Sequence, residues 1–94
     1  MTKKTSAATL AADLGILKSR VVEAQMKAKL VAAVAAEVRR RRLTHTQLAN
    51  HSGLGRTTVT GILSGSLQKV SLGRVLRLVA AAGLEADLRI RRAA

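Results

Sequence analysis

The fold of this 94-residue chain is decided by residues 43–65, which read LTHTQLANHSGLGRTTVTGILSG. Two short segments, residues 46–51 and residues 56–63, have helical spacing and are separated by a turn that contains glycine. Two helices can cross closely in such a unit if there is a small residue at the crossing, a turn residue that tolerates positive φ, and apolar anchors on the second helix. The positions that meet these needs are Ala49, Gly53, Val59 and Ile62. The stretch therefore predicts a helix-turn-helix whose second helix could enter the major groove of DNA.

The residues before this unit predict a long helix preceded by a short one. A small, polar arm leads to the short helix, which Gly15 ends because glycine readily takes the positive φ of a helix end. Ser19 can cap a long helix over residues 20–41, in which apolar residues recur every four positions and pack on the rest of the domain. The chain is thus divided into an N-terminal arm with a short helix, residues 1–18, and a DNA-binding domain, residues 19–94.

The residues after the unit predict a further helix and then a β-strand. Ser71 can cap a helix over residues 72–82, and Gly83 ends it. Over residues 84–91 the period changes from about 3.6 to about 2, because apolar residues alternate with charged ones. We therefore expect an all-α, five-helix domain with a short C-terminal β-strand that pairs in a dimer.

The predicted strand needs a pairing partner, because a lone strand at the end of a helical domain is not stable. Two copies of residues 84–91 paired antiparallel about Leu88 would set each charged residue opposite a residue of the other sign. The dimerisation residues on this hypothesis are Leu84, Ala86, Asp87, Leu88, Arg89 and Ile90. The strand could instead pair with a protein partner or with the N-terminal arm of its own chain, and periodicity does not decide between these.

The chain is strongly basic, with 17 Lys and Arg against 5 Asp and Glu and a formal net charge of +12. Eight of the basic residues, but no acidic one, lie between residues 38 and 84. Such a stretch favours contact with the phosphates of a nucleic acid. The absence of Phe, Tyr and Trp disfavours single-stranded nucleic acid, whose bases usually stack on aromatic side chains. Double-stranded DNA is therefore the expected partner.

Other classes of protein lack their characteristic residues in this sequence. There is no cysteine for a disulfide framework or a thiolate zinc site, and we expect neither a metal nor a cofactor. No G-x-S-x-G elbow, paired carboxylates or phosphate-binding glycine loop is present, so we expect no catalytic residues and no enzyme. No apolar stretch is long enough to cross a bilayer or to form a signal core, which predicts a cytoplasmic, nucleoid-associated protein without membrane contact.

Residues 43–65 resemble the helix-turn-helix of the Xre/Cro repressor family. The resemblance extends more weakly to residues 28–91 as a whole. With its C-terminal tail, the chain is similar to the small antitoxins of bacterial type II toxin-antitoxin pairs, of the HigA or HipB kind, which bind operator DNA as dimers and also bind a toxin. The resemblance implies a sequence-specific transcriptional regulator that represses its own operon and neutralises a cognate toxin. The alternative is a stand-alone Xre-type repressor with no toxin partner.

The resemblance also implies roles for individual residues. It assigns base reading to Arg56, Thr57, Thr60 and Gly61. An arginine at the start of the second helix could bind guanine O6 and N7, and a threonine methyl could contact thymine. The implied phosphate contacts include two arginines at the basic end of the long helix. The full set is Arg41, Arg42, His45, Thr46, Thr58, Ser64, Ser66 and Lys69. A homodimer would place two such helices about 34 Å apart on a pseudo-palindromic operator. The sequence departs from the family at His45, where Gln is usual, and at Gly55, where a polar cap is usual.

Overall fold

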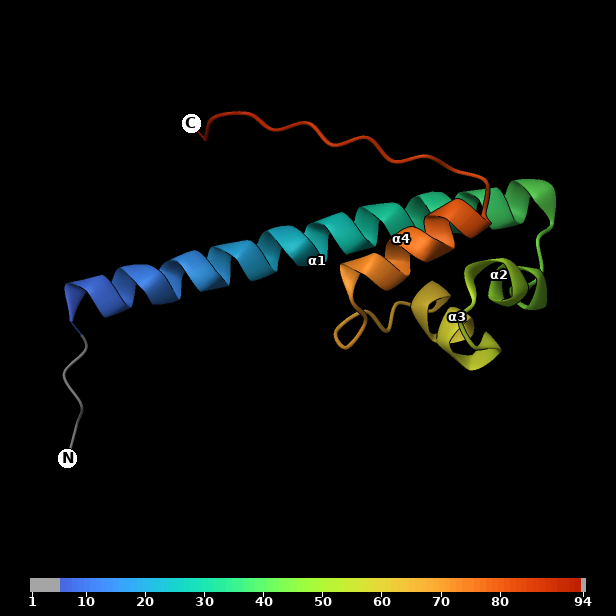
Figure 1. Ribbon diagram of the computed structural model, residues 1–94, viewed down its shortest axis with the longest axis horizontal. Helices are drawn as coiled ribbons and strands as arrows, with labels where there is room; N and C mark the ends of the chain where they lie inside the picture. The colour runs from blue at the N-terminus through green and yellow to red at the C-terminus, as the bar shows by residue number, and fades with distance from the viewer. Residues whose placement is uncertain (1–5, 94) are drawn as a thin grey trace.

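The computed structural model describes residues 6–93, which form four α-helices and an extended C-terminal segment. The helices are α1 (Ala7–Arg41), α2 (His45–Ser52), α3 (Arg56–Leu63) and α4 (Leu72–Ala81). Figure 1 shows α1 running along the length of the molecule, with the three shorter helices gathered against its C-terminal half. We call this half of α1, residues 27–41, together with α2, α3 and α4 the bundle. The described residues are all-α, as the sequence predicts.

The core lies inside the bundle. Its buried apolar residues are Val31, Val34, Leu48, Leu54, Val59, Ile62, Val75, Leu78, Val79 and Ala82. The predicted anchors of α3, Val59 and Ile62, are only 0% and 1% exposed, so α3 is held by its inner face. Gly53 adopts a φ of 71° in the turn between α2 and α3, a conformation that glycine takes without steric cost. The predicted helix-turn-helix is therefore confirmed.

Side-chain caps fix the starts of two of the short helices. The Thr44 side chain accepts a hydrogen bond from the Gln47 backbone N–H, and the Gln47 side chain accepts one from the Thr44 backbone N–H. This capping box begins α2. Ser71 accepts a hydrogen bond from the Arg74 backbone N–H and so begins α4, as predicted. α3 starts at Arg56, after the N-cap residue Gly55, and has no side-chain cap, so its position depends on its packing.

The prediction of five helices is wrong, because one helix forms where two were expected. α1 is capped by Ser6 and continues through Gly15 without a break. A glycine inside a helix costs only about 0.5–1 kcal/mol relative to alanine, and the alanine-rich sequence around it favours helix strongly enough to continue. Ser19, the predicted cap, instead donates a hydrogen bond to the Ile16 carbonyl within the helix.

The N-terminal part of α1 extends beyond the bundle. Every residue from 6 to 26 is exposed, and Lys27 is the first buried residue in the described part of the chain. We call residues 7–26 the projecting half. The predicted boundary between residues 18 and 19 falls inside this uninterrupted helix, and the division into arm and domain stays a prediction. Residues 1–5 of the predicted arm lie outside the described residues.

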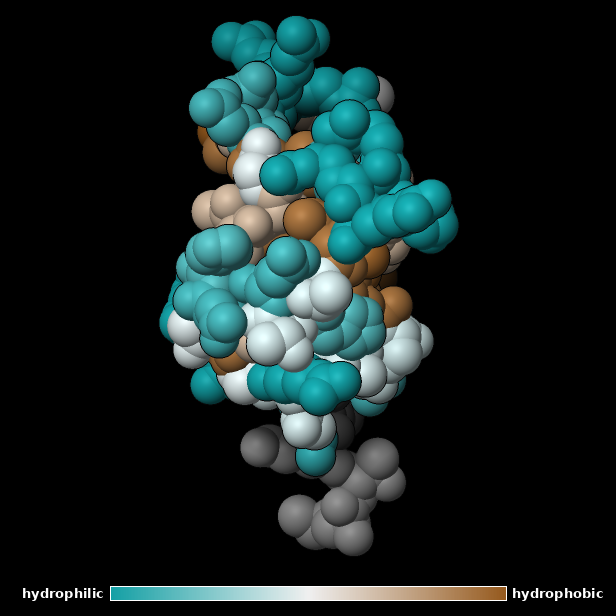
Figure 2. Space-filling view, turned by 90° about the vertical axis from the view of Figure 1, so that its right-hand side faces the viewer, coloured by the Kyte–Doolittle hydropathy of each residue, from teal (hydrophilic) through white to brown (hydrophobic). Residues whose placement is uncertain are grey.

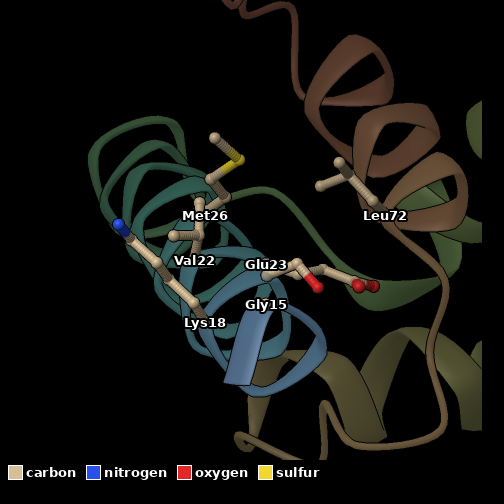
Figure 3. A pocket seen from close by; sticks show the side chains of 7 residues that line it. Gly15, Lys18, Val22, Glu23, Met26 and Leu72 are labelled. Carbon is tan, nitrogen blue, oxygen red and sulfur yellow. The ribbon is translucent and has the colours of Figure 1, made fainter. Parts of the chain in front are cut away.

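An open hollow lies where the projecting half meets the bundle. Figure 3 shows Val22 and Met26 on α1 across from Leu72 at the start of α4, with Glu23 directed between the two helices. The apolar side chains of this hollow come from both helices. α4 therefore leaves part of its first turn uncovered beside α1.

A buried lysine ties α1 to the loop before α4. Lys27 Nζ donates hydrogen bonds to the carbonyl oxygens of Leu67 and Val70 at 3.0 and 2.9 Å. The same nitrogen lies 3.7 Å from the carboxylate of Glu23, one turn earlier in α1. With these partners the ammonium group is satisfied despite its burial, and the loop is fixed against the long helix.

The predicted C-terminal strand is also wrong. Residues 84–93 are extended, but within residues 6–93 no β-strand forms. Figure 1 shows the segment leaving the end of α4 and running back toward the N-terminal end of α1. Its apolar residues Leu88 and Ile90 are 72% and 87% exposed. The alternating pattern favours an extended backbone, but a strand also requires a second strand to complete its hydrogen bonds, and the described residues supply none.

Candidate nucleic-acid interface

α3 presents a polar face to solvent, opposite its buried anchors. The predicted base-reading residues share this face: Arg56, Thr57, Thr60 and Gly61. At about 100° per residue they fall within about 140° of one another, and Val59 and Ile62 fall on the opposite side. The first three are exposed and the glycine is half-buried. We call this surface the outer face of α3.

Gly61 leaves an open place on the outer face. A Cβ built at this position would meet no atom within 4 Å, and the helix continues to Leu63. The Gly61 carbonyl accepts hydrogen bonds from the Ser66 backbone N–H at 3.0 Å and from Ser64 Oγ at 2.9 Å. No contact within the described chain therefore requires glycine here. A close approach of DNA to this backbone stays a prediction.

A histidine on α2 contacts the outer face of α3. His45 Nδ1 lies 2.7 Å from Thr60 Oγ1, a hydrogen bond in which either atom can donate, depending on the histidine tautomer. The bond holds the Thr60 hydroxyl toward the first turn of α2. It couples a predicted phosphate contact with a predicted base-reading residue. The two residues are 15 positions apart, and the only sequence signal was the histidine in place of the usual glutamine.

The remaining predicted phosphate contacts lie in two places. One group lies on the first turns of α2 and α3 and in the loop after α3: Thr46, Thr58, Ser64, Ser66 and Lys69. The other group, Arg41 and Arg42, lies where α1 ends. Six of the eight predicted phosphate contacts, with His45 included, thus lie on α2, on α3 or in the loop after α3, and the two arginines lie at the end of α1.

Two arginines in this region bind backbone carbonyls of the bundle. Arg41 Nη1 donates a hydrogen bond to the Ala82 carbonyl at 3.0 Å, which links the ends of α1 and α4. Arg77 Nε donates to the Ser52 carbonyl at 2.9 Å, at the end of α2. Neither role was predicted from the sequence, because charge alone does not separate an arginine that fixes the fold from one that faces solvent.

Residues 38–84, which include α2, α3 and α4, contain no carboxylate side chain and therefore no negatively charged side chain. The preceding acid, Glu37, accepts hydrogen bonds from Arg40 Nε and Nη2, both at 2.9 Å. These hydrogen bonds lower the pKa of Glu37 and raise that of Arg40. Figure 2, which faces the end of the molecule where α2 lies, shows mainly hydrophilic and intermediate side chains over its lower part. A basic, polar surface of this kind suits the phosphates and grooves of duplex DNA.

No helix within residues 6–93 is both long and apolar enough to cross a membrane. Across the same residues, no three or more His, Asp or Glu side chains are grouped so that they could hold a metal ion.

Comparisons with known proteins agree with this geometry. A solved structure of a "Putative XRE Family Transcriptional Regulator" is similar to this chain, with a TM-score of 0.65, 27% sequence identity, and coverage of 76% of this chain and 80% of the other. A search of curated proteins found no match. The family described as "Helix-turn-helix domain" matches residues 10–91, from the projecting half of α1 to the extended tail. The chain therefore belongs to this helix-turn-helix domain family.

Proposed function

We propose that this chain is a sequence-specific, double-stranded DNA-binding transcriptional regulator that places α3 in the major groove. The outer face of α3 carries the proposal, because exposed Arg56, Thr57 and Thr60 stand on a helix whose inner residues, Val59 and Ile62, are fully buried. A helix held in this way offers the same side chains in the same places to successive base pairs, as base reading requires. The similarity to a solved structure named as a putative XRE-family transcriptional regulator supports the proposal.

The side chains around α3 would divide the work between specificity and affinity. Arg56, the first residue of α3, would bind a guanine through two hydrogen bonds, a contact worth about 1–3 kcal/mol of discrimination. Thr46 on α2 and Ser66 and Lys69 in the loop after α3, all three exposed, would bind phosphates and set the register of the protein on the duplex. The His45 side chain would keep Thr60 oriented during this contact.

The test is to select a binding site from random duplexes and then to titrate the selected duplex and a scrambled one. Arg56→Ala is expected to weaken binding to the selected site about 5- to 150-fold and to relax the preference at one base pair. The matched control, Lys69→Ala, is expected to weaken both duplexes alike and to reduce the salt slope by about one. Both side chains are exposed, so the fold should survive either change. Equal losses on both duplexes for Arg56→Ala would contradict base reading by α3.

We also propose that the regulator acts as a homodimer on a pseudo-palindromic operator. A two-fold dimer would set two α3 helices about 34 Å apart, one turn of DNA. A contribution of the tail to the contact between copies stays a prediction for Leu84, Ala86, Asp87, Leu88, Arg89 and Ile90. Deleting residues 84–94 and measuring the mass in solution tests this contribution. A shortened chain that dimerises as tightly as the full one would show that the tail does not contribute to the dimer.

The more specific form of the proposal is an antitoxin of a type II toxin-antitoxin pair, which represses its own operon in the cytoplasm and neutralises a toxin. It is supported by the sequence resemblance, and by exposed Leu88 and Ile90, which offer apolar contacts to a protein partner. The test is affinity capture of the product of the neighbouring reading frame by the full chain. If that product does not bind, the alternative of a stand-alone repressor replaces the antitoxin role.

A further inference from the structure

α1 carries a second apolar stripe beside the one that the bundle buries. The second face consists of residues spaced alternately four and three positions apart: Leu10, Leu14, Leu17, Val21, Ala24 and Ala28. This spacing is the a/d repeat of a coiled coil. At about 100° per residue these six residues span about 80° of the helix, and the buried residues of α1, Val31, Lys27 and Val34, lie about 60°, 100° and 120° from the centre of that span. Val31 is the next position of the repeat and is buried in the bundle, so the exposed part of the repeat ends at Ala28. We call the six residues the α1 seam.

The seam is uncovered in the described chain. Its four large residues, Leu10, Leu14, Leu17 and Val21, are 53%, 58%, 57% and 55% exposed. A lone helix of about 20 residues is marginally stable in water, because nucleation is costly and most helix stability in proteins comes from the packing of an apolar face. The side chains that line the hollow of Figure 3 lie on a different face of α1 and do not cover the seam.

We propose that the seam packs against the same seam of a second copy, in a parallel two-stranded coiled coil. An apolar repeat of 3.5 residues is complemented by a helix with the same repeat, since each knob enters a hole formed by four residues of the facing helix. Each of the six positions faces the same position of the second copy, which gives six layers over residues 10–28. Ala24 and Ala28 at the bundle end of the seam allow the two backbones to approach closely there.

The charges of the projecting half permit this contact between two basic proteins. Residues 7–26 contain Asp13 and Glu23 against Lys18 and Arg20, so their net charge is zero, whereas the whole chain carries +12. All of the excess positive charge therefore lies outside the projecting half. The two paired segments therefore carry no net charge by which they would repel each other.

The charges beside the seam also set the direction of the pair. Asp13 occupies a g position and Lys18 the e position five residues later, so a parallel pair forms this attractive contact twice. Arg20 would meet the neutral Gln25 in the same way. The antiparallel arrangement that pairs all six layers would instead set Lys18 against Lys18 of the second copy, and Arg20 against its Arg20. Repulsion between these like charges disfavours the antiparallel arrangement, so the parallel one is favoured.

A parallel pair also places both bundles at the same end of the coiled coil, related by a two-fold axis along it. Two α3 helices related in this way suit the two halves of a palindromic DNA site. The inference therefore rests on the homodimer of the proposed function and names its surface. It does not depend on base reading by α3, because the contact can be measured without DNA.

Sedimentation equilibrium of the full chain tests the seam. The unaltered chain is expected to dimerise, and Leu17→Glu to raise the dissociation constant at least about tenfold, because two carboxylates would be buried in the apolar seam. The matched control is Ile16→Glu, since Ile16 is 50% exposed but lies outside the seam, and it should leave the constant within about twofold. An unaltered chain that stays monomeric, or a Leu17→Glu chain that dimerises as well as the unaltered one, would overturn the proposal.

Cysteine cross-linking tests the direction, and the chain has no cysteine of its own to interfere. Leu10→Cys is expected to form a disulfide-linked dimer on oxidation, because the two sulfurs face each other in a parallel pair. The antiparallel pair would hold them about 27 Å apart, too far for a disulfide. Ile16→Cys is the control outside the seam and should cross-link far more slowly. Equal rates for the two variants would overturn the parallel seam.

DNA binding separates a failure of this inference from a failure of the proposed function. Leu17→Glu should still bind a single half-site duplex with unaltered base preference, because α3 is untouched. If Leu17→Glu remains a dimer and deletion of residues 84–94 abolishes it, the contact belongs to the tail, the seam is overturned, and the homodimer stands.

Discussion

The bundle and the projecting half of α1 have similar apolar spacing but differ in what their side chains contact. In the bundle, residues such as Val34 and Ile62 are buried, because each helix packs its apolar face on another. In the projecting half, Leu14 and Leu17 occupy equally regular positions and remain exposed. Regular apolar spacing therefore suffices for a helix, but only packing fixes a side chain in place. The candidate DNA-reading face is held by the bundle, and the surface open to another protein lies on the projecting half.

Replacing one isoleucine in each region should give the largest contrast. Ile62→Ala is expected to lower the free energy of unfolding by about 2–5 kcal/mol, because it leaves a cavity between α3 and the rest of the core. That is a large part of the roughly 5–14 kcal/mol expected for a domain of this size. Ile16→Ala should change the free energy of unfolding by less than about 0.5 kcal/mol. Urea unfolding followed by circular dichroism measures both. Equal losses would mean that the projecting half is packed in solution.

Two glycines, one from each region, should respond to alanine with opposite signs. Gly53→Ala is expected to cost about 1–2 kcal/mol, because φ is 71° and the new Cβ would lie 2.7 Å from Arg77 Nη2. Gly15→Ala should stabilise α1 by about 0.5–1 kcal/mol, because the Cβ would meet nothing within 4 Å and alanine favours helix. Thermal unfolding and the helical signal at low temperature measure the two effects. A loss of helix in Gly15→Ala would contradict the continuous α1.

The capping box of α2 offers a smaller effect inside the bundle. Thr44→Ala is expected to cost about 1 kcal/mol, because the Gln47 backbone N–H loses its acceptor at the start of the helix. Thr46→Ala is the matched control, since Thr46 is exposed on the same helix, and it should change stability by less than about 0.5 kcal/mol. Urea unfolding again gives both values. If the two variants lost the same stability, the capping box would not be what fixes the start of α2.

The parts of the bundle that could be predicted from sequence depend on local preferences. The bounds of α3 (Arg56–Leu63) and the positive φ of Gly53 were predicted correctly, and so was the start of α4 at Ser71. Apolar spacing, glycine conformation and a serine cap each act within a few residues, so the sequence around them contains the whole signal.

The errors arose where a local signal competes with its surroundings. Gly15 is compatible with a helix end, but the neighbouring residues favour helix strongly enough to continue through it. The alternation of residues 84–91 is compatible with a strand, but a strand requires a second extended segment to pair with. The pattern within residues 84–91 contains no information about such a segment.

The candidate site was predictable on α3 and much less so around it. Once the helix is located, helical periodicity predicts which residues lie on its outer face. The position of Arg56 could be predicted from the start of the helix alone. The contact of His45 with Thr60 joins residues 15 apart, and that of Arg41 with Ala82 joins residues 41 apart. Such contacts depend on how the helices cross. Charge had placed Arg41 among the phosphate contacts, whereas its guanidinium also holds α1 to α4.

The smallest expected effect concerns the ion pair of Glu37 and Arg40 in the bundle part of α1. Hydrogen bonding to the guanidinium lowers the pKa of Glu37 in the folded chain below its ordinary value of 4.5. The unfolded chain therefore takes up the proton first as the pH falls, and the stabilisation by the pair, complete above the unfolded pKa, is lost as the pH falls through the folded pKa. Urea unfolding should thus show Glu37→Gln to be slightly less stable than the unaltered chain at about pH 7, and the difference should disappear as the pH falls below the folded pKa of Glu37. A difference that persists at the lower pH would trace to the amide's effect on the helix and not to the charge.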